Sequence, residues 1–210
     1  MSNSSSANDS GLRRSPELLS RFRSHLLIVD VQEKLVPVIQ DAEAMISGCT
    51  YLMQTAEATG VPICVSEQYP KGLGSSVDAV LQNTAQEHVV EKLRFSASEA
   101  FLQYCASRYP DSDSRQQERD QVVIAGIEAH ICVLQTAFDL LAHGLRVCVV
   151  EDAVGSRRQS DASAAMRRIR DAGAVVLTAE SAAFEWCETA GTEIFRQVSR
   201  LTQHRDAART

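Results

Sequence analysis

The stretch VVIAGIEAHICVLQTAFDLLAHG, from Val122 to Gly144, decides the fold. It opens with the apolar and mostly β-branched run Val122–Ala125, and a turn follows at Gly126. Apolar residues then recur at the spacing of a helix until Gly144, a residue type that commonly ends helices. These apolar positions are Ile131, Leu134, Phe138 and Leu141. The pattern predicts a buried strand that passes through a tight turn into a helix.

Cys132 lies where this predicted helix begins. A thiol at that place faces backbone N–H groups without helical partners and the positive end of the helix dipole, and both favour the thiolate. Cys132 is therefore a candidate nucleophile. The alternative is a small buried residue at a junction between a strand and a helix.

Two further stretches end an apolar run in a charged side chain. HLLIVDVQ begins at His25 and contains Asp30, and HVVEKLRFSA begins at His88 and contains Lys92. The carboxyl ends of parallel strands share one edge of a sheet, so an acid, a lysine and Cys132 could meet there. The acid could take the thiol proton, and the ammonium could stabilise the thiolate.

Short apolar runs alternate with helical patterns along the rest of the chain. We predict strands at 25–29, 61–66, 89–92, 122–125, 145–150 and 175–177. We predict helices at 41–59, 99–109, from Cys132 to Gly144, at 161–172, and through the remainder to Gln203. This alternation predicts an α/β fold of three αβα layers, with a mainly parallel six-stranded sheet and helices on both faces.

The chain is predicted to form one domain, residues 21–210, after a flexible N-terminal tail, residues 1–20. The first fifteen residues, MSNSSSANDSGLRRS, are rich in Ser and Asn and almost devoid of apolar side chains. Arg13 and Arg14 in this tail are most simply solvated, although they could also contact a neighbouring subunit.

Composition restricts the partners and the compartment. The 210 residues carry a net charge of −6, so no basic face for a nucleic acid is expected. None of the six cysteines forms a C-x-x-C pair, a usage that fits a reducing compartment. No apolar run approaches the length of a membrane span, and residues 1–20 lack the core of a secretory signal. We expect a cytoplasmic protein with neither a nucleic-acid nor a membrane partner.

The three stretches together resemble a known family. LLIVDVQ, EKLRFSA and GIEAHICV occur in the order typical of the isochorismatase-like cysteine hydrolases, and the resemblance covers about Ser24 to Leu201. It is strongest to the branch of isochorismatase domain-containing proteins that has a SEQYPKGLG-like loop, here Ser66 to Gly74. The resemblance implies a Rossmann-like topology.

The resemblance also implies roles for residues that match the family's motifs. Cys132 aligns with the nucleophile, Asp30 with the general acid and base, and Lys92 with the lysine of the triad. A non-proline cis peptide would join Ile127 to Glu128. The backbone N–H groups of Glu128 and Cys132 would then form the oxyanion hole.

The residues near the expected triad indicate which of the family's reactions this chain is expected to catalyse. Gln32, Gln68 and Tyr69 are candidates for lining the substrate pocket. The loop from Ser66 to Gly74 has no histidine, so we expect neither the metal of the family's nicotinamidases nor any other cofactor. The isochorismatases proper lack the cysteine, so Cys132 favours an amidase-like reaction. His130 could suggest a Cys–His dyad, but Asp30 already fills the role of the base.

The predicted function is hydrolysis of a small-molecule amide or related C–N bond through a Cys-Asp-Lys triad and a thioester. The alternative is a catalytically retired protein that serves as an oligomeric binding module. A nucleotide-binding oxidoreductase would need a glycine-rich turn after the first strand, and the sequence that follows Asp30 has none. The apolar C-terminal stretch Ala182, Ala183, Phe184 and Trp186, together with the habit of the family, favours a homo-oligomer.

Overall fold

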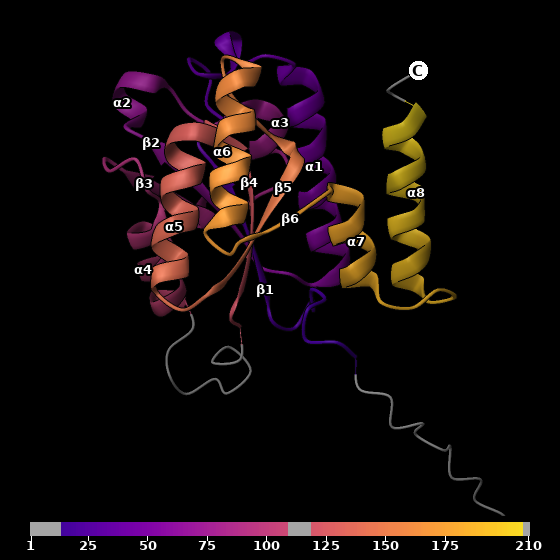
Figure 1. Ribbon diagram of the computed structural model, residues 1–210. Coiled ribbons are helices and arrows are strands. Elements are labelled where there is room, and N and C mark those ends of the chain that lie inside the picture. The colour runs from indigo at the N-terminus through magenta and orange to yellow at the C-terminus, as the bar shows by residue number, and fades with distance from the viewer. Residues whose placement is uncertain (1–13, 109–118, 208–210) are drawn as a thin grey trace, which may run out of the picture.

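The computed structural model describes residues 14–108 and 119–207, and it places parallel strands side by side in a six-stranded sheet (Figure 1). The strand order is β3-β2-β1-β4-β5-β6, and every neighbouring pair is parallel. The strands are β1 (Ser24–Val29), β2 (Ile63–Gln68), β3 (Val89–Lys92), β4 (Gln121–Ile127), β5 (Arg146–Gly155) and β6 (Val175–Leu177). The predicted fold class is confirmed.

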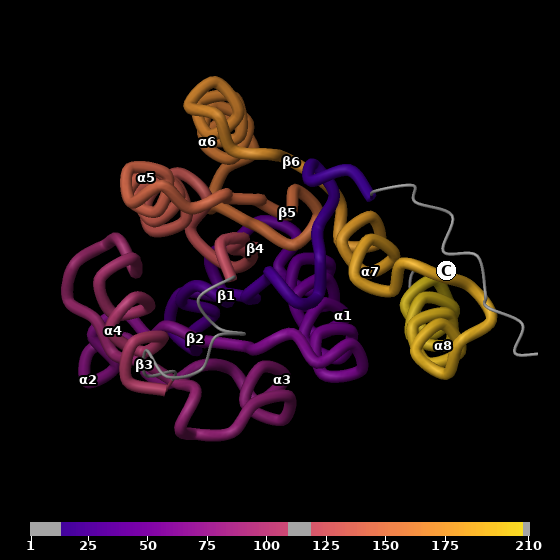
Figure 2. Tube along the Cα trace, turned by 90° about the horizontal axis from the view of Figure 1, so that it is seen from below, coloured from indigo at the N-terminus to yellow at the C-terminus, as the bar shows by residue number. Residues whose placement is uncertain are grey.

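Helices cover both faces of this sheet. They are α1 (Ala42–Thr59), α2 (Pro70–Leu73), α3 (Asp78–Leu81), α4 (Ser98–Arg108), α5 (Leu134–Ala142), α6 (Gln159–Asp171), α7 (Ala179–Cys187) and α8 (Glu193–Ala207). Short 3-10 turns occur at Val36–Val38 and Gln86–His88. The view from below separates the layers: α4, α5 and α6 lie on one side of the sheet, and α1, α7 and α8 lie on the other (Figure 2).

Strand β1 explains why two helical layers are needed. Its side chains alternate between the faces of the sheet: Leu26 and Ile28 join the core under α1 and α7, whereas Leu27 and Val29 join the core under α4 and α5. All four are fully buried. A central parallel strand that is apolar on both faces can be covered only by helices on both sides.

Strands β1 and β4 approach closely at the carboxyl end of β1. Gly126 has φ +116°, and a Cβ at this position would lie 2.1 Å from the carbonyl oxygen of Val29. Gly126, which was predicted as a turn, is therefore the residue where β4 packs against the end of β1, and only glycine fits there.

Strand β5 is longer than predicted. The predicted strand ends at Val150, directly before the charged residues Glu151 and Asp152. The strand instead continues to Gly155, and its register against β4 shifts between Ile124 and Gly126. The extra residues are accommodated by this irregularity, so that Gly155 pairs with Ile127.

The N-terminal segment and the C-terminal helix α8 of the described chain both pack against α7. The predicted C-terminal helical region is broken into α7 and α8, with Glu188 at φ +64° and Gly191 at φ +82° between them. Residues 14–20, assigned above to the tail, contact α7: Leu19 is buried, and its N–H donates to Glu185 at 2.6 Å. Arg14 donates to Glu188 of the same chain at 3.0 Å. Arg13 and the rest of the predicted tail lie outside the described residues.

Candidate active site

Asp30, Lys92 and Cys132 come from three different strands and meet at one edge of the sheet. Asp30 follows β1 in a left-handed conformation (φ +52°), Lys92 ends β3, and Cys132 lies in a π-helical turn, Ala129–Val133, between β4 and α5. Since β1 is central in the strand order, Asp30 lies between the other two. Each of these residues lies at or just beyond the carboxyl end of a parallel strand, where α/β proteins bind ligands.

Asp30 and Lys92 form a buried ion pair. Lys92 Nζ lies 2.7 Å from Asp30 Oδ2, and the two side chains are 3% and 0% exposed. The hydroxyl of Ser66 donates to Asp30 Oδ1 at 2.8 Å. Burial is the largest influence on this carboxyl and raises its pKa, while Lys92 and the hydrogen bonds oppose the rise. Asp30 is thereby suited to accept and return a proton.

The other bonds of Lys92 hold its ammonium in place. Nζ donates to the side-chain oxygen of Gln68 at 2.7 Å and to the backbone carbonyl of Phe95 at 2.9 Å. A longer bond of 3.2 Å reaches the carbonyl of Arg94. All of these partners are acceptors, so together they fix the position of Nζ beside Asp30.

Cys132 is 6% exposed, and its thiol does not have the low pKa expected from the start of a helix. Burial raises the pKa of the thiol to about 12, and the nearby Asp30 carboxylate raises it further than Lys92 and the Glu128 backbone lower it. The expectation of a stabilised thiolate is wrong for the free protein. A helix dipole contributes little compared with loss of hydration and an adjacent negative charge.

The backbone before Cys132 has the unusual geometry that the resemblance implies. The Ile127–Glu128 peptide bond is cis. A backbone hydrogen bond from Glu128 contributes to lowering the pKa of Cys132, which places the Glu128 N–H beside the thiol sulfur. This N–H is therefore near the point where the oxygen of an attacked carbonyl would accumulate charge.

Gln32 is not free to contact a substrate with its amide. Its Nε2 donates to the carbonyls of Gln68 at 3.0 Å and Gly74 at 2.6 Å, and its Oε1 accepts from the Gln68 N–H at 2.7 Å. The side chain is fully buried. Gln32 thus connects the end of β2 to the loop ending at Gly74.

Gln68 and Tyr69 have different places in the site. The amide of Gln68 accepts from Lys92, and its Nε2 donates to the carbonyl of Leu93 at 2.8 Å, so this side chain supports the lysine. Tyr69 is 50% exposed at the rim. Leu93 and Phe95, which the sequence analysis did not single out, are 77% and 55% exposed next to it. Their position directly after Lys92 in the EKLRFSA motif was the sequence feature that could have identified them as residues near the site.

Side chains of the turn itself bond to the segment after β5. Arg157 Nε lies 3.0 Å from Glu128 Oε2. The Nδ1 atom of His130 lies 3.0 Å from the hydroxyl oxygen of Ser156. His130 is therefore hydrogen-bonded to Ser156, whereas the Cys132 thiol is hydrogen-bonded to Asp30.

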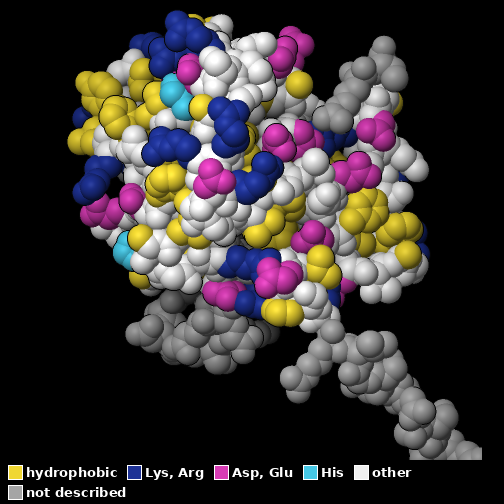
Figure 3. Space-filling model, viewed as in Figure 1, with side chains coloured by type: hydrophobic (Ala, Val, Ile, Leu, Met, Phe, Trp, Pro, Cys, Tyr) yellow, Lys and Arg dark blue, Asp and Glu magenta, His cyan; other side chains and the backbone are white. Residues whose placement is uncertain are grey.

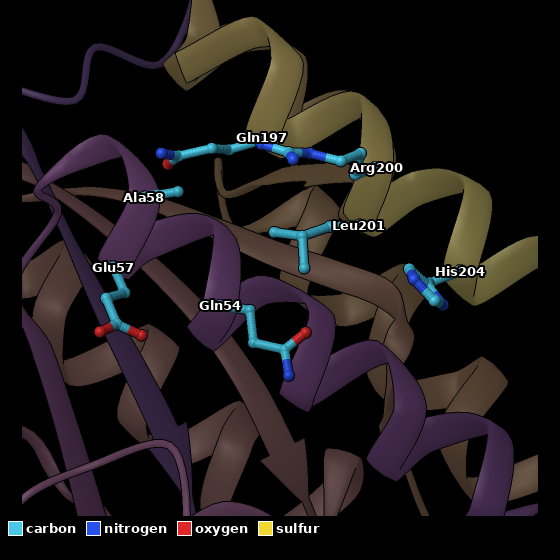
Figure 4. Close-up of a pocket in the computed structure, with 7 residues that line it drawn as sticks. All are labelled: Gln54, Glu57, Ala58, Gln197, Arg200, Leu201 and His204. Atoms are coloured by element: carbon cyan, nitrogen blue, oxygen red, sulfur yellow. The ribbon is translucent and has the colours of Figure 1, made fainter. Parts of the chain in front are cut away.

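Other features of the described residues lie apart from the triad. A groove of about 490 Å³ lies between α1 and α8. Its lining side chains are Gln54, Glu57, Ala58, Gln197, Arg200, Leu201 and His204 (Figure 4). They lie toward the C-terminal end of α1, which runs back toward the start of β2, so the groove is at the opposite end of the sheet from Cys132.

Two features are absent from residues 14–108 and 119–207. In these ranges, no group of three or more His, Cys, Asp or Glu side chains is arranged to hold a metal ion. No helix in the same ranges has both the length and the apolar character needed to cross a bilayer.

Comparisons with known proteins match this architecture. A family model described as "Isochorismatase domain" matches residues 24–181. Isochorismatase domain-containing protein 2 of Danio rerio is 33% identical over 186 residues, which are 89% of this chain and 90% of that protein. The solved structure of the MAR1 ribonuclease from Caenorhabditis elegans has a TM-score of 0.77 and 32% identity, and the match covers 89% of this chain and 92% of that one.

A more distant structure shares the fold alone. The YcaC gene product of Escherichia coli, described as an octameric hydrolase of unknown specificity, has a TM-score of 0.76 and 19% identity. The match covers 93% of this chain and 100% of that chain.

Proposed function

Because the chain belongs to the isochorismatase domain family, we propose that it is a cysteine-dependent hydrolase of a small-molecule amide or related C–N bond. The observation that supports this most is the placement of Asp30, which is paired with Lys92 at 2.7 Å and hydrogen-bonded to Cys132. A base, a cation and a nucleophile are thus in contact at one edge of the sheet, as covalent catalysis requires.

In the proposed reaction, the Cys132 sulfur attacks the carbonyl carbon while its proton passes to Asp30. The oxygen that becomes negative is held by the N–H groups of Glu128 and Cys132. When the tetrahedral intermediate collapses, the C–N bond breaks and Asp30 returns the proton to the leaving amine. Water, deprotonated by Asp30, then cleaves the thioester and releases the carboxylic acid and the thiol.

The raised pKa of the thiol determines how the first step proceeds. With a pKa of about 12, Cys132 remains protonated in the free protein at neutral pH. Proton transfer to Asp30 is therefore coupled to attack on the bound carbonyl instead of preceding it. Lys92 stabilises the negative charge that moves from the carboxylate to the sulfur.

The first experiment compares the wild type with Cys132→Ala on a panel of small amides. We expect wild-type turnover and a covalent adduct, seen as a mass increase on Cys132, and loss of both in the variant without a change in Tm. Cys105→Ala, which changes a partly buried thiol on α4, is the control and should keep the activity. Full turnover by Cys132→Ala would exclude the proposed nucleophile.

The same assay separates the alternatives. A retired, oligomeric binding protein would turn over none of the amides.

The C. elegans relative is named as a ribonuclease, so RNA is included as a substrate. Charges of both signs are interspersed over the face that α5 and α6 form (Figure 3), and with a net charge of −6 this supports the absence of a nucleic-acid partner. Degradation of RNA that depends on Cys132 would overturn that part of the proposal.

The working state is a cytoplasmic homo-oligomer. Tyr69, Leu93 and Phe95 leave hydrophobic surface exposed near the site, and hydrophobic side chains gather where α2 and the end of β3 lie (Figure 3). All six cysteines are free thiols, which suits a reducing compartment. Light scattering that gives the mass of one chain at working concentration would exclude the oligomer, and fractionation of the source cells tests the compartment.

A further inference from the structure

The segment after β5 leaves the sheet beside the active-site turn. The last residue pair of β4 and β5 is Ile127 with Gly155. The next residues on the two strands, Glu128 and Ser156, therefore emerge side by side at the edge where Cys132 lies. Because the register of β5 shifts against β4, Gly155 pairs with Ile127, and Ser156 therefore lies beside Glu128.

Two side chains of the turn are held by this segment. Glu128 Oε2 accepts from Arg157 Nε at 3.0 Å and, in a longer bond of 3.4 Å, from the Arg157 backbone N–H. His130 bonds through Nδ1 to the Ser156 hydroxyl at 3.0 Å. Glu128 and Ser156 are buried, and so is Ala129, which lies between Glu128 and His130. The two contacts thus hold the turn on either side of Ala129.

The segment is itself anchored to another part of the chain. The carbonyl of Ser156 accepts from the Gln40 N–H at 3.1 Å, and the Gln159 N–H donates to the side-chain oxygen of Gln40 at 3.1 Å. Gln40 precedes α1, so the segment is fixed to an element outside the turn. A fixed support is required if contacts are to position the turn instead of moving with it.

We infer that Arg157, together with Ser156, is a positioning residue that holds Glu128 and His130 so that the Glu128 N–H stays directed at the reacting carbonyl oxygen. The inference rests on the proposed hydrolase function for its effect on turnover, but not for its effect on Cys132. It also assigns the Glu128 carboxylate a structural partner, so Glu128 acts through its backbone and not as an acid or base.

The test compares Arg157→Gln with Arg158→Gln in the amide assay. Arg158 is the adjacent arginine; it is exposed, and its ion-pair distance to Asp161 is 4.0 Å, so it serves as a matched control. We expect Arg157→Gln to lower kcat about tenfold with little change in KM, because an oxyanion donor acts in the transition state more than in substrate binding. Arg157→Lys keeps the charge and should recover part of the loss.

A double-mutant cycle tests whether the effect passes through Glu128. Glu128→Gln and Arg157→Gln should together lower kcat no more than the larger single change, because both break the same contact. Additive losses, or equal kcat values for Arg157→Gln and Arg158→Gln with unchanged Tm, would overturn the inference. If Arg157→Gln fails to fold, the comparison is made with Arg157→Lys.

A measurement without substrate keeps this inference separate from the proposed function. In an Asp30→Asn background, which removes the carboxylate that opposes ionisation, iodoacetamide modification of Cys132 is followed against pH. Adding Arg157→Gln should slow the modification about threefold at a fixed pH and move the midpoint upward, since the Glu128 N–H no longer stabilises the thiolate. An unchanged midpoint would contradict the positioning role even if no amide is a substrate.

Discussion

At the scale of residues, Asp30 and Cys132 illustrate why a candidate nucleophile can be recognised in the sequence while its ionisation cannot. The motif around Cys132 predicts a reactive cysteine at the start of a helix. Its pKa depends on the loss of water around it and on the distance to Asp30, which is more than a hundred positions away in the chain. Both quantities exist only in the folded protein.

Replacing Asp30 should make Cys132 more reactive toward an alkylating agent while abolishing catalysis. Asn fits the left-handed conformation at this position, and the exchange removes one negative charge next to the thiol. The pKa of Cys132 should then fall below about 12. We expect iodoacetamide at pH 8 to modify Cys132 in Asp30→Asn about tenfold faster, the effect of roughly one pKa unit. Amide turnover should be lost, because no base remains.

Asp78→Asn provides the control for this change of charge. Asp78 is exposed at the start of α3, so its replacement should leave both the alkylation rate and turnover unchanged. Slower alkylation of Cys132 in Asp30→Asn would mean that the carboxylate assists ionisation of the thiol, contrary to the geometry described above.

At the scale of elements, the buried side chain of Arg205 connects helix α8 to β5 and α1. Arg205 Nη2 lies 2.7 Å from Asp152 Oδ2, and its guanidinium lies 5.0 Å from the centre of the Tyr51 ring on α1. The other carboxylate oxygen of Asp152 accepts from the N–H of Ala179 at the start of α7. Asp152, which lies just beyond the predicted end of β5, thus connects β5, α7 and α8.

Breaking this connection should destabilise the protein. Arg205 is 6% exposed, so Arg205→Met leaves the carboxylate of Asp152 without this counter-charge. We expect the free energy of unfolding to fall by about 2 kcal/mol, below the loss for a fully buried pair because Asp152 is partly exposed. Urea denaturation measures the change.

Arg200→Met on the same helix is the matched control for Arg205→Met. Its side chain is 67% exposed and lies 3.7 Å from Glu193, so its loss should cost less than about 0.5 kcal/mol. Equal destabilisation by the two variants would show that the Arg205 contact has no special role in attaching α8.

At the scale of the whole molecule, the sheet brings distant segments together and buries groups that titrate. His25 in β1 is almost fully buried against Phe101. Burial lowers the pKa of His25 from 6.5 to about 4, with a smaller contribution from Arg119. Folding therefore requires His25 to be neutral, and this requirement makes the stability of the molecule depend on pH.

The free energy of unfolding should decrease as the pH falls from about 6.5 to about 4. In this window the unfolded chain binds a proton at His25 and the folded protein does not, so acid favours unfolding. The contribution of this group is fully present above pH 6.5 and amounts to about 3 kcal/mol. His25→Leu should flatten the pH dependence in this window, as measured by urea denaturation at several pH values. An unaltered profile would assign the dependence to other groups.

The sequence by itself determined the fold class, the approximate positions of the strands and the choice of the three residues proposed as the triad. Strand β1 is predicted to within a residue of its observed bounds, since an apolar run that is buried on both faces is a local pattern. The sequence also predicted that Asp30, Lys92 and Cys132 lie at one edge of the sheet, because parallel strands end together and the motifs resemble those of a known family.

Only the tertiary structure decided how this edge works. The resting state of Cys132, the use of Gln32 and Gln68 as supports, and the contact of Arg157 with Glu128 all depend on distances between residues far apart in the chain. The length of β5 and its shifted register follow from pairing with β4 and not from local preference. Local patterns encode which residues are apolar or turn-forming, whereas burial and electrostatic coupling arise when separate segments pack, so they are properties of the folded molecule alone.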